Sequence, residues 1–312
     1  MELGNLIDLT QTAVELGLIG ALTALALFLS YSMLNVCDLS TDGCFTLGAA
    51  VGAVFVLSGH PFLAIVMAMA SGMLSGLITA LLQTKLGIND LLSGIIVNTG
   101  LYSINIWIMG GASILNMNRK ETIFTMLGDA LKDTPLEGKQ VLVIALAAAA
   151  LTVVFMSLFL RTRLGLAIRA TGDNPEMVRS SSINTALMTI IGLVVANAFT
   201  ALSGALMAQS QKSVDINLGT GMVVIALASL LIGNTFIGKT RRIPSRAVGA
   251  VLGAIIFRMI FMIALRFDIP SFMLKLVSSI LVTAAIAGPY LKKQFPLIQR
   301  KYFGKRAQKE AR

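Results

Sequence analysis

The sequence is poor in charge, in cysteine and in histidine, and each shortage excludes a class of protein. Only 13% of its 312 residues are charged, whereas about 25% is usual for a soluble domain. With 56% hydrophobic residues and a mean hydropathy of +0.83, a soluble fold of this length has too little interior to hide its apolar surface. The composition also excludes a disordered chain and a soluble nucleic-acid-binding protein. We therefore predict an all-α membrane protein that crosses the bilayer several times and has no nucleic acid among its partners.

The residues that carry most enzyme chemistry are scarce or scattered. Two cysteines, Cys37 and Cys44, are too few for a disulfide framework and are interpreted as reduced. The single histidine, His60, lies before Pro61 in a short predicted turn. No paired carboxylates, nucleophile elbow or cluster with metal-ligand spacing occurs. We expect no enzyme, no cofactor and no metal site.

One motif matches a nucleotide-binding loop by letter. Residues 233–240 read GNTFIGKT, which fits the phosphate-binding pattern G-x-x-x-x-G-K-[ST]. That loop requires a preceding strand and a later metal-binding Asp. Here the preceding residues form a run of membrane length, and Pro244 follows within five residues of Lys239. We interpret the match as accidental.

About nine windows are apolar enough to span a bilayer, which takes about 20 residues. Two of them, 44–59 and 221–238, are short, and each adjoins a polar stretch that contains Gly, residues 35–43 and 233–244. Such breaks are typical of discontinuous helices along a transport path, although a tilted helix that ends in a loop explains them equally well. The windows are 13–34, 44–59, 61–83, 91–110, 140–160, 185–209, 221–238, 247–265 and 271–291.

The distribution of Lys and Arg predicts the orientation. The basic tail, residues 292–312, holds eight basic residues and one acid. If this tail is cytoplasmic, the inside segments hold 17 of the 25 basic residues and the outside segments hold six, as the positive-inside rule requires. We predict a transmembrane domain over residues 1–291 with an outside N-terminus, followed by the cytoplasmic tail; the family resemblance described below implies that the membrane is the bacterial cytoplasmic (inner) membrane.

Two further patterns bear on packing. The outside loop 111–139 carries Ile123, Phe124, Leu127 and Leu131 at helical spacing, which predicts a short surface helix. Pairs of glycines four residues apart allow helices to approach closely in lipid. They occur at Gly48/Gly52, Gly72/Gly76 and Gly249/Gly253.

Polar and charged groups within the spans are the candidates for a solute path. The break at 35–43 contains two acids, and irregular backbone at membrane depth needs protein or water around it; an ordinary cytoplasmic turn is the alternative. Arg258 lies near mid-membrane, where an unpaired Arg is costly, and Glu15, Asp38 and Asp42 are its candidate partners. We favour a structural pairing over contact with solute. The predicted path residues are Asn35, Asp38, Asp42, Asn98, Asn105, Asn197 and Ser203.

The segment 161–184 is predicted to be cytoplasmic and to contain a capped helix. Asp173 or Asn174 serves as the N-cap, Pro175 occupies the first turn and Glu176 follows. A short helix between two spans suits docking to a motor subunit; a plain surface helix, or a site for anionic lipid, is the alternative. The predicted coupling residues are Asp173, Asn174, Pro175, Glu176, Met177, Arg179 and Ser182.

Several stretches resemble one family, the permease subunits of bacterial ABC importers in the branched-chain amino acid and ribose permease superfamily. The coupling stretch LGLAIRATGDNPEMVRSSSIN and the later ALSGAL are similar to segments of that family, although Ser181 and Ser182 replace small apolar residues or Gly of many members. DLSTDGCFTLGAAVGAV, TGLYSINIWIMGG and RATGDN resemble the tryptophan and tyrosine uptake subgroup. The resemblance covers roughly residues 20–290.

The resemblance implies a permease embedded in lipid that works with two ABC ATPase subunits and an extracytoplasmic substrate-binding protein. The permease is a homodimer with a second copy of this chain or, as the alternative, a heterodimer. An aromatic or other amino acid is the implied solute. The alternatives are an ABC permease for a sugar or nucleoside and an ion-coupled secondary transporter. The latter predicts acids deep in the spans, where only Asp38 and Asp42 qualify.

Overall fold

The computed structural model describes residues 3–132, 138–237 and 242–265, with a few single residues between 273 and 287. This part of the chain is almost entirely helical, so the predicted all-α membrane fold is confirmed. The elements are α1 (Leu3–Leu27), the π-helix η1 (Phe28–Met33), α2 (Thr41–Leu57), α3 (Pro61–Thr84), α4 (Asp90–Ile108), β1 (Ile114–Asn116), α5 (Ile123–Ala130), α6 (Gln140–Phe159), α7 (Arg163–Asp173), α8 (Pro175–Ser180), α9 (Thr185–Gln211), β2 (Ser213–Asp215), α10 (Met222–Ile237) and α11 (Ile243–Leu265).

Six of the described helices are long and apolar enough to cross a membrane, and α2 and α10 are shorter apolar helices. These eight correspond to the first eight predicted windows. The ninth window, 271–291, lies mostly outside the described residues. The tail 292–312 lies outside them entirely.

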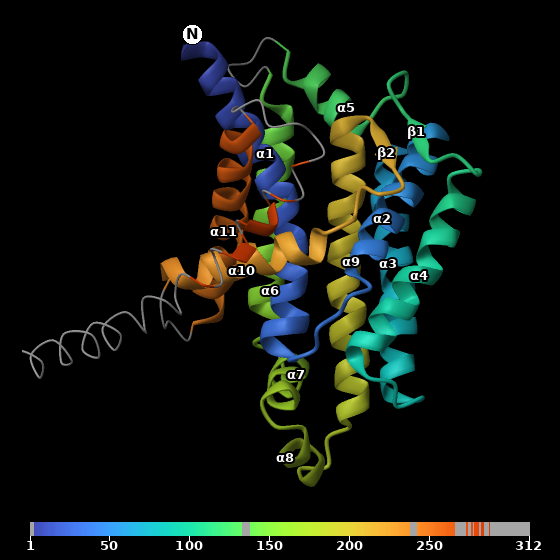
Figure 1. Ribbon diagram of the computed structural model, residues 1–312, viewed down its shortest axis with the longest axis vertical. Helices are drawn as coiled ribbons and strands as arrows, with labels where there is room; N and C mark the ends of the chain where they lie inside the picture. The colour runs from blue at the N-terminus through green and yellow to red at the C-terminus, as the bar shows by residue number, and fades with distance from the viewer. Residues whose placement is uncertain are drawn as a thin grey trace, which may run out of the picture.

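The long helices run along one axis of the molecule, and the connections gather at its two ends (Figure 1). The N-terminus, α5 and the two-stranded sheet lie at one end, while α7 and α8 lie at the opposite end. In the sheet β1 pairs antiparallel with β2, with Ile114 opposite Asp215. The segments predicted to lie on opposite sides of the membrane, 111–139 and 161–184, are therefore at opposite ends of the bundle.

Helix α9 runs through the middle of the bundle and packs against α1, α2 and α3. Its neighbours approach it through glycine. A Cβ added at Gly48 would collide with the backbone of Ala201, and one added at Gly72 would collide with the Asn197 carbonyl. The predicted close approach is thus confirmed for α2 and α3, because a larger residue would force the helices apart.

The third glycine pair serves a different interface. Gly249 and Gly253 of α11 face α10, and a Cβ on Gly253 would collide with the Ser229 carbonyl. The surfaces that join these two helices are therefore also built from small residues.

The short helices α2 and α10 each begin after an irregular stretch. Helix α1 ends in η1, Asn35 adopts a positive φ of 58°, and residues 34–40 lead back into the bundle before α2 begins (Figure 1). Of the second predicted break, 233–244, residues 233–237 continue α10, α11 begins at Ile243, and residues 238–241 lie outside the described residues. A further stretch with positive φ angles at Lys212 (53°) and Gly221 (86°), which includes β2, precedes α10.

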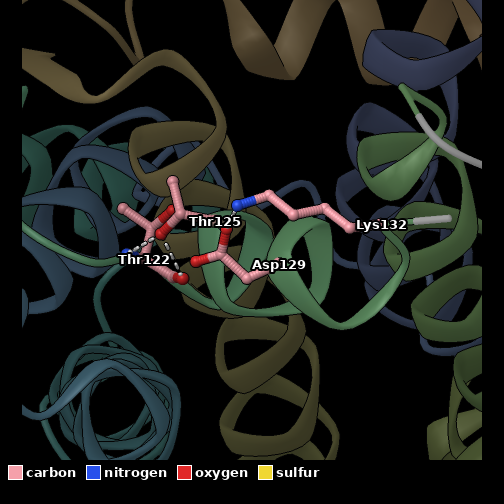
Figure 2. A network of polar contacts seen from close by, with 4 residues as sticks. All are labelled: Thr122, Thr125, Asp129 and Lys132. Carbon is pink, nitrogen blue, oxygen red and sulfur yellow. Dashed lines mark hydrogen bonds and ion pairs between the residues drawn. The ribbon is translucent and has the colours of Figure 1, made fainter.

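The predicted surface helix in loop 111–139 is confirmed as α5. It begins with a capping box in which the Thr122 and Thr125 side chains each accept a hydrogen bond from the other's backbone N–H, at 3.3 Å and 2.7 Å (Figure 2). Ile123 and Phe124 are buried. Asp129 and Lys132 form an exposed ion pair of 2.6 Å on the outer side of the helix (Figure 2). Such exposed pairs contribute little stability, so the cap and the buried face hold α5 in place.

Candidate solute path and coupling surface

The two acids of the first break have different partners. Asp38 is 1% exposed, and its Oδ1 accepts hydrogen bonds from the Ser40 backbone N–H at 2.8 Å and the Ser40 hydroxyl at 2.6 Å. Its Oδ2 accepts a 2.7 Å hydrogen bond from Nδ2 of Asn197 in α9. Asp38 therefore fixes the turn before α2 and ties that turn to the central helix.

Asp42, one turn further on, caps a different helix. Its Oδ2 accepts a hydrogen bond from the Gly221 backbone N–H and its Oδ1 accepts one from Val223, both at 2.8 Å. The first N–H groups of a helix have no partner within the helix and favour a negative charge. The first turn of α2 thus supplies the N-terminal cap of α10. Thr46 extends this junction, because its hydroxyl accepts a 3.1 Å hydrogen bond from the Gly219 N–H.

A polar cavity of about 390 Å³ adjoins this junction. It lies between the start of α2, the middle of α4 and the loop before α10. Its volume is within the range of small-molecule sites, about 300–1,000 Å³. Among its described lining residues one side chain is a carboxylate and none is Lys or Arg. They are Asp42, Gly43, Thr46, Asn98, Thr99, Tyr102, Ser103, Asn105, Ile216, Asn217 and Thr220.

Asn105 is the most deeply buried polar side chain of the α4 wall, with 1% of its surface exposed. Its Nδ2 donates a 3.1 Å hydrogen bond to the Gly43 carbonyl. Its Oδ1 accepts no hydrogen bond from any described residue. A buried acceptor without a donor costs about 1–3 kcal/mol, and this oxygen is buried within the wall rather than exposed on its surface.

The structure brings together only part of the predicted path. Asp42, Asn98 and Asn105 line the cavity. Asn197 lies beside Asp38, and the Ser203 hydroxyl donates a 2.7 Å hydrogen bond to the Ile19 carbonyl of α1. These two, with Asn35 and Asp38, are not among the lining residues.

The predicted path list omits six polar lining residues: Thr46, Thr99, Tyr102, Ser103, Asn217 and Thr220. For Tyr102 a signal was present, since Asn98, Tyr102 and Asn105 share one helical face at spacings of four and three residues. Asn217 and Thr220 belong to the polar, Gly-containing stretch before the second short helix, a signal of the same kind as the stretch 35–43 before the first.

The expected partners of Arg258 are wrong within the described part of the chain. Asp38 and Asp42 are engaged as above, and Glu15 accepts a 2.9 Å hydrogen bond from the Gln11 side chain. No ion pair joins Arg258 to any of the three. Its guanidinium carbon instead lies 6.0 Å from the centre of the Phe261 ring one turn away, a distance at which a cation is attracted to an aromatic face.

The segment 161–184 contains two helices, α7 and α8. Asn174 is the cap of α8, because its Oδ1 accepts a 3.1 Å hydrogen bond from the Met177 N–H. Pro175 is the first residue of α8, and Asp173 ends α7. The observed helix, Pro175–Ser180, is shorter than predicted, and Ser182 adopts a positive φ of 61° just beyond its end.

One face of α8 is anchored and the other is free. Val178 is buried, and the Arg179 Nε donates a 3.1 Å hydrogen bond to the Thr185 hydroxyl at the start of α9. Met177 is 67% exposed, and Glu176 is also exposed. An apolar side chain held on a rigid helix at the end of the bundle is suited to contact another protein.

The phosphate-loop match has the wrong local structure. Gly233 lies inside α10, where it packs against the Gly249 carbonyl of α11. A helix, and not a strand, precedes the match. Lys239 and Thr240 lie outside the described residues.

Comparison with known proteins gives consistent results. The sequence profile described as "Branched-chain amino acid transport system / permease component" matches residues 10–287. A tyrosine transport system permease protein of Clostridioides difficile (strain R20291) is 34% identical over 271 residues, which cover 86% of this chain and 88% of the relative. No solved structure matches the chain.

Two more distant relatives have names that indicate another solute. A guanosine ABC transporter permease of Bacillus subtilis (strain 168) is 27% identical over 70% of each chain. A nucleoside ABC transporter permease of Lactococcus lactis subsp. cremoris (strain MG1363) is 22% identical over 72% of this chain and 71% of the relative.

Proposed function

Since the chain belongs to the branched-chain amino acid transport system permease family, and is thus a permease subunit of an ABC transporter rather than an enzyme, we propose that it imports an amino acid, with an aromatic one such as tyrosine as the first candidate. The family works in general with ABC ATPase and binding-protein subunits. The multi-pass helical fold suits the inner membrane, in which ABC permeases of this family act.

The cavity at the α2–α10 junction is the observation that carries this proposal. It is large enough for a single amino acid and is lined by hydroxyl, amide and carboxylate groups at the level where two short helices begin. Such groups replace part of the hydration that a polar solute loses on leaving water. We assign the solute path to this cavity, with Asp42, Asn98 and Asn105 on its wall.

The coupling surface is assigned to α8. Asn174 caps this helix, Arg179 fixes it to α9 and the Met177 side chain faces outward. An ATPase subunit that seats Met177 transmits its motion to α9, which in turn contacts α2 and α3. In this arrangement α7 and α8 face the cytoplasm, the N-terminus and α5 face outward, and a second copy of the chain completes the permease.

A nucleoside is the second candidate solute, because two relatives carry that name. An ion-coupled secondary mechanism has less support. Asp38 and Asp42, the two acids at the break before α2, are both held by hydrogen bonds, whereas an ion-coupling acid has to change partners during the cycle.

Reconstituted transport tests the proposal. The permease, the ATPase and the binding protein are purified together in proteoliposomes, and uptake of labelled L-tyrosine and guanosine is measured with and without ATP. We expect ATP-dependent tyrosine uptake that stops when the ATPase carries an inactivating substitution. Uptake that needs no ATP and collapses with an ionophore would establish the secondary mechanism instead.

A further inference from the structure

Two arginines from different helices form one positively charged site, and we propose that this site binds the phosphate of an anionic phospholipid. They are Arg169 of α7 and Arg246 of α11. Helix α7 lies at the end of the bundle opposite the N-terminus (Figure 1). The site includes no residue of α8 and no lining residue of the solute cavity, so this binding is additional to the proposed transport.

The π-helix η1 brings the two arginines together. The Arg246 guanidinium carbon lies 5.3 Å from the centre of the buried Phe28 ring in η1. Helix α7 in turn packs against the end of η1, where a Cβ added at Gly172 would collide with the Met33 carbonyl. Arg169 and Arg246 are consequently close enough for their positive charges to repel each other.

The described part of the chain supplies no anion to this pair. Both side chains are half-buried, and neither guanidinium makes an ion pair or a hydrogen bond with a described residue. Asp173 lies one turn beyond Arg169 in α7, but no ion pair joins them. The Phe28 ring attracts the Arg246 cation without cancelling its charge. Because like charges repel more strongly away from bulk water, an anion that contacts both arginines would relieve this repulsion.

The sequence before and within α11 is equally one-sided in charge. Residues 216–267 contain no Asp or Glu, whereas residues 239–246 contain four basic residues. Among these, Arg242 is exposed and lies one turn before Arg246, whose backbone N–H donates a 3.2 Å hydrogen bond to the Arg242 carbonyl. A third cation is thus within one turn of the pair, and the local charge is complementary to an anionic ligand.

The surroundings favour a lipid phosphate over a dissolved one. Leu166, one turn before Arg169, is 53% exposed, and Val248, just after Arg246, is 44% exposed. Exposed apolar side chains beside basic ones are typical of helices at the boundary between hydrocarbon and headgroups. Basic pockets between transmembrane helices bind anionic headgroups, and the planar guanidinium matches two phosphate oxygens at once. The lipid phosphate therefore lies between the two arginines, with its acyl chains along the apolar surface of α11.

Lipid binding to the full-length permease tests this site. The delipidated protein is placed in phosphatidylcholine nanodiscs with increasing amounts of phosphatidylglycerol, and the lipids that stay bound after release are counted by native mass spectrometry. We expect Arg169→Gln and Arg246→Gln each to lower the apparent affinity for phosphatidylglycerol about fivefold, the effect of one arginine on an anionic headgroup. Arg163→Gln removes the same charge from an exposed position of α7 and should bind as wild type does.

The control separates a site from general attraction to a charged surface. Arg169→Gln leaves the Arg246–Phe28 contact in place, so it tests the site even if Arg246→Gln fails to insert. Equal losses in Arg169→Gln and Arg163→Gln would overturn the proposal, because they would show attraction by the whole surface.

Two further outcomes would also overturn it. Inorganic phosphate, added to pure phosphatidylcholine nanodiscs at matched ionic strength, offers the same oxygens without acyl chains. If it raised the thermal unfolding midpoint of wild type as much as phosphatidylglycerol does, the ligand would be a dissolved anion. If Arg169→Gln and Arg246→Gln bound phosphatidylglycerol normally but no longer bound the ATPase subunit, the arginines would contact acidic groups of that protein instead.

Discussion

The carboxylate of Asp38 accepts a 2.7 Å hydrogen bond from the side-chain amide of Asn197, 159 positions further along the chain. Both residues are 1% exposed. The contact joins the turn before α2 to the middle of α9, at the same level as the glycine contacts between these helices. A charged acceptor buried in this way is stable only while its donors remain in place.

Removal of either partner should destabilise the bundle. We expect Asp38→Ala or Asn197→Ala to lower the free energy of unfolding by about 2–4 kcal/mol, because each leaves a buried polar group without its partner. The exchanged pair, Asp38→Asn with Asn197→Asp, should recover part of the loss. Unfolding in detergent with increasing SDS measures this, with Ser58→Ala at an exposed helix end as the control. If the double variant Asp38→Ala with Asn197→Ala lost as much stability as the two single variants added together, the contact would contribute nothing.

The cap that Asp42 supplies to α10 should be visible in hydrogen exchange. Asp42→Ala frees the N–H groups of Gly221 and Val223, and loss of an N-cap costs about 1–2 kcal/mol. We expect faster amide exchange in peptides that cover residues 216–226. The exchange rate of Asp42→Asn should lie between those of wild type and Asp42→Ala, because Asn keeps one acceptor. Asn184→Ala, which uncaps α9 instead, should leave these peptides unchanged. Unaltered exchange in Asp42→Ala would contradict the cap.

Two glycines in different helices of the bundle should respond in opposite ways to alanine. A Cβ at Gly48 collides with the Ala201 backbone, while one at Gly20 of α1 meets nothing within 4 Å. We expect Gly48→Ala to destabilise by about 1–3 kcal/mol or more, as overpacking does. Gly20→Ala should be neutral or stabilising by up to about 1 kcal/mol, because alanine favours helix. Thermal unfolding in nanodiscs compares the two; similar midpoints would refute the close α2–α9 contact.

Exposed methionines at the two ends of the bundle allow a matched test of the coupling surface. Met177 of α8 is 67% exposed and Met126 of α5 is 39% exposed. We expect Met177→Glu to reduce permease-stimulated ATPase activity about tenfold or more, since an unpaired charge at a docking surface costs over about 1.4 kcal/mol. Met126→Glu should change it little. The amount of inserted protein serves as the control, and equal activities would move the ATPase contact away from α8.

The orientation is open to a labelling test. In a Cys37→Ser background, in which the remaining Cys44 is buried, Asn118→Cys and Ser181→Cys place thiols on exposed residues at opposite ends of the bundle. From the positive-inside rule we expect an impermeant maleimide to label position 118 in intact cells and position 181 only after lysis. The reverse pattern would invert the orientation of the whole domain.

The sequence was sufficient to predict the class of fold and most of the helices. Membrane-length apolar windows, the glycine pairs and the cap at Asn174 are local signals, because each depends on residues that are close in the chain. The same applies to α5, whose apolar face follows a helical period. These features could be predicted because no distant contact is needed to produce them.

The assembly of the cavity could not be predicted in this way. Asp38 and Asp42 are one helical turn apart and have the same chemistry, yet the first binds Asn197 of α9 and the second caps α10. No local pattern distinguishes them, because their partners lie far along the chain. Glycine spacing likewise predicts close approach without naming the partner helix, and for Gly253 that partner is α10 rather than α9.

The junction between α2 and α10 also has a consequence for biosynthesis. Gly221 follows Asp42 by 179 positions, so the ribosome requires roughly 10–40 s to reach it at the usual rate of translation. During that interval the Asp42 carboxylate has no α10 to cap, and the first turn of α2 cannot take its final place. The junction between α2 and α10 therefore forms only after the start of α10, in the C-terminal third of the chain, has been synthesised.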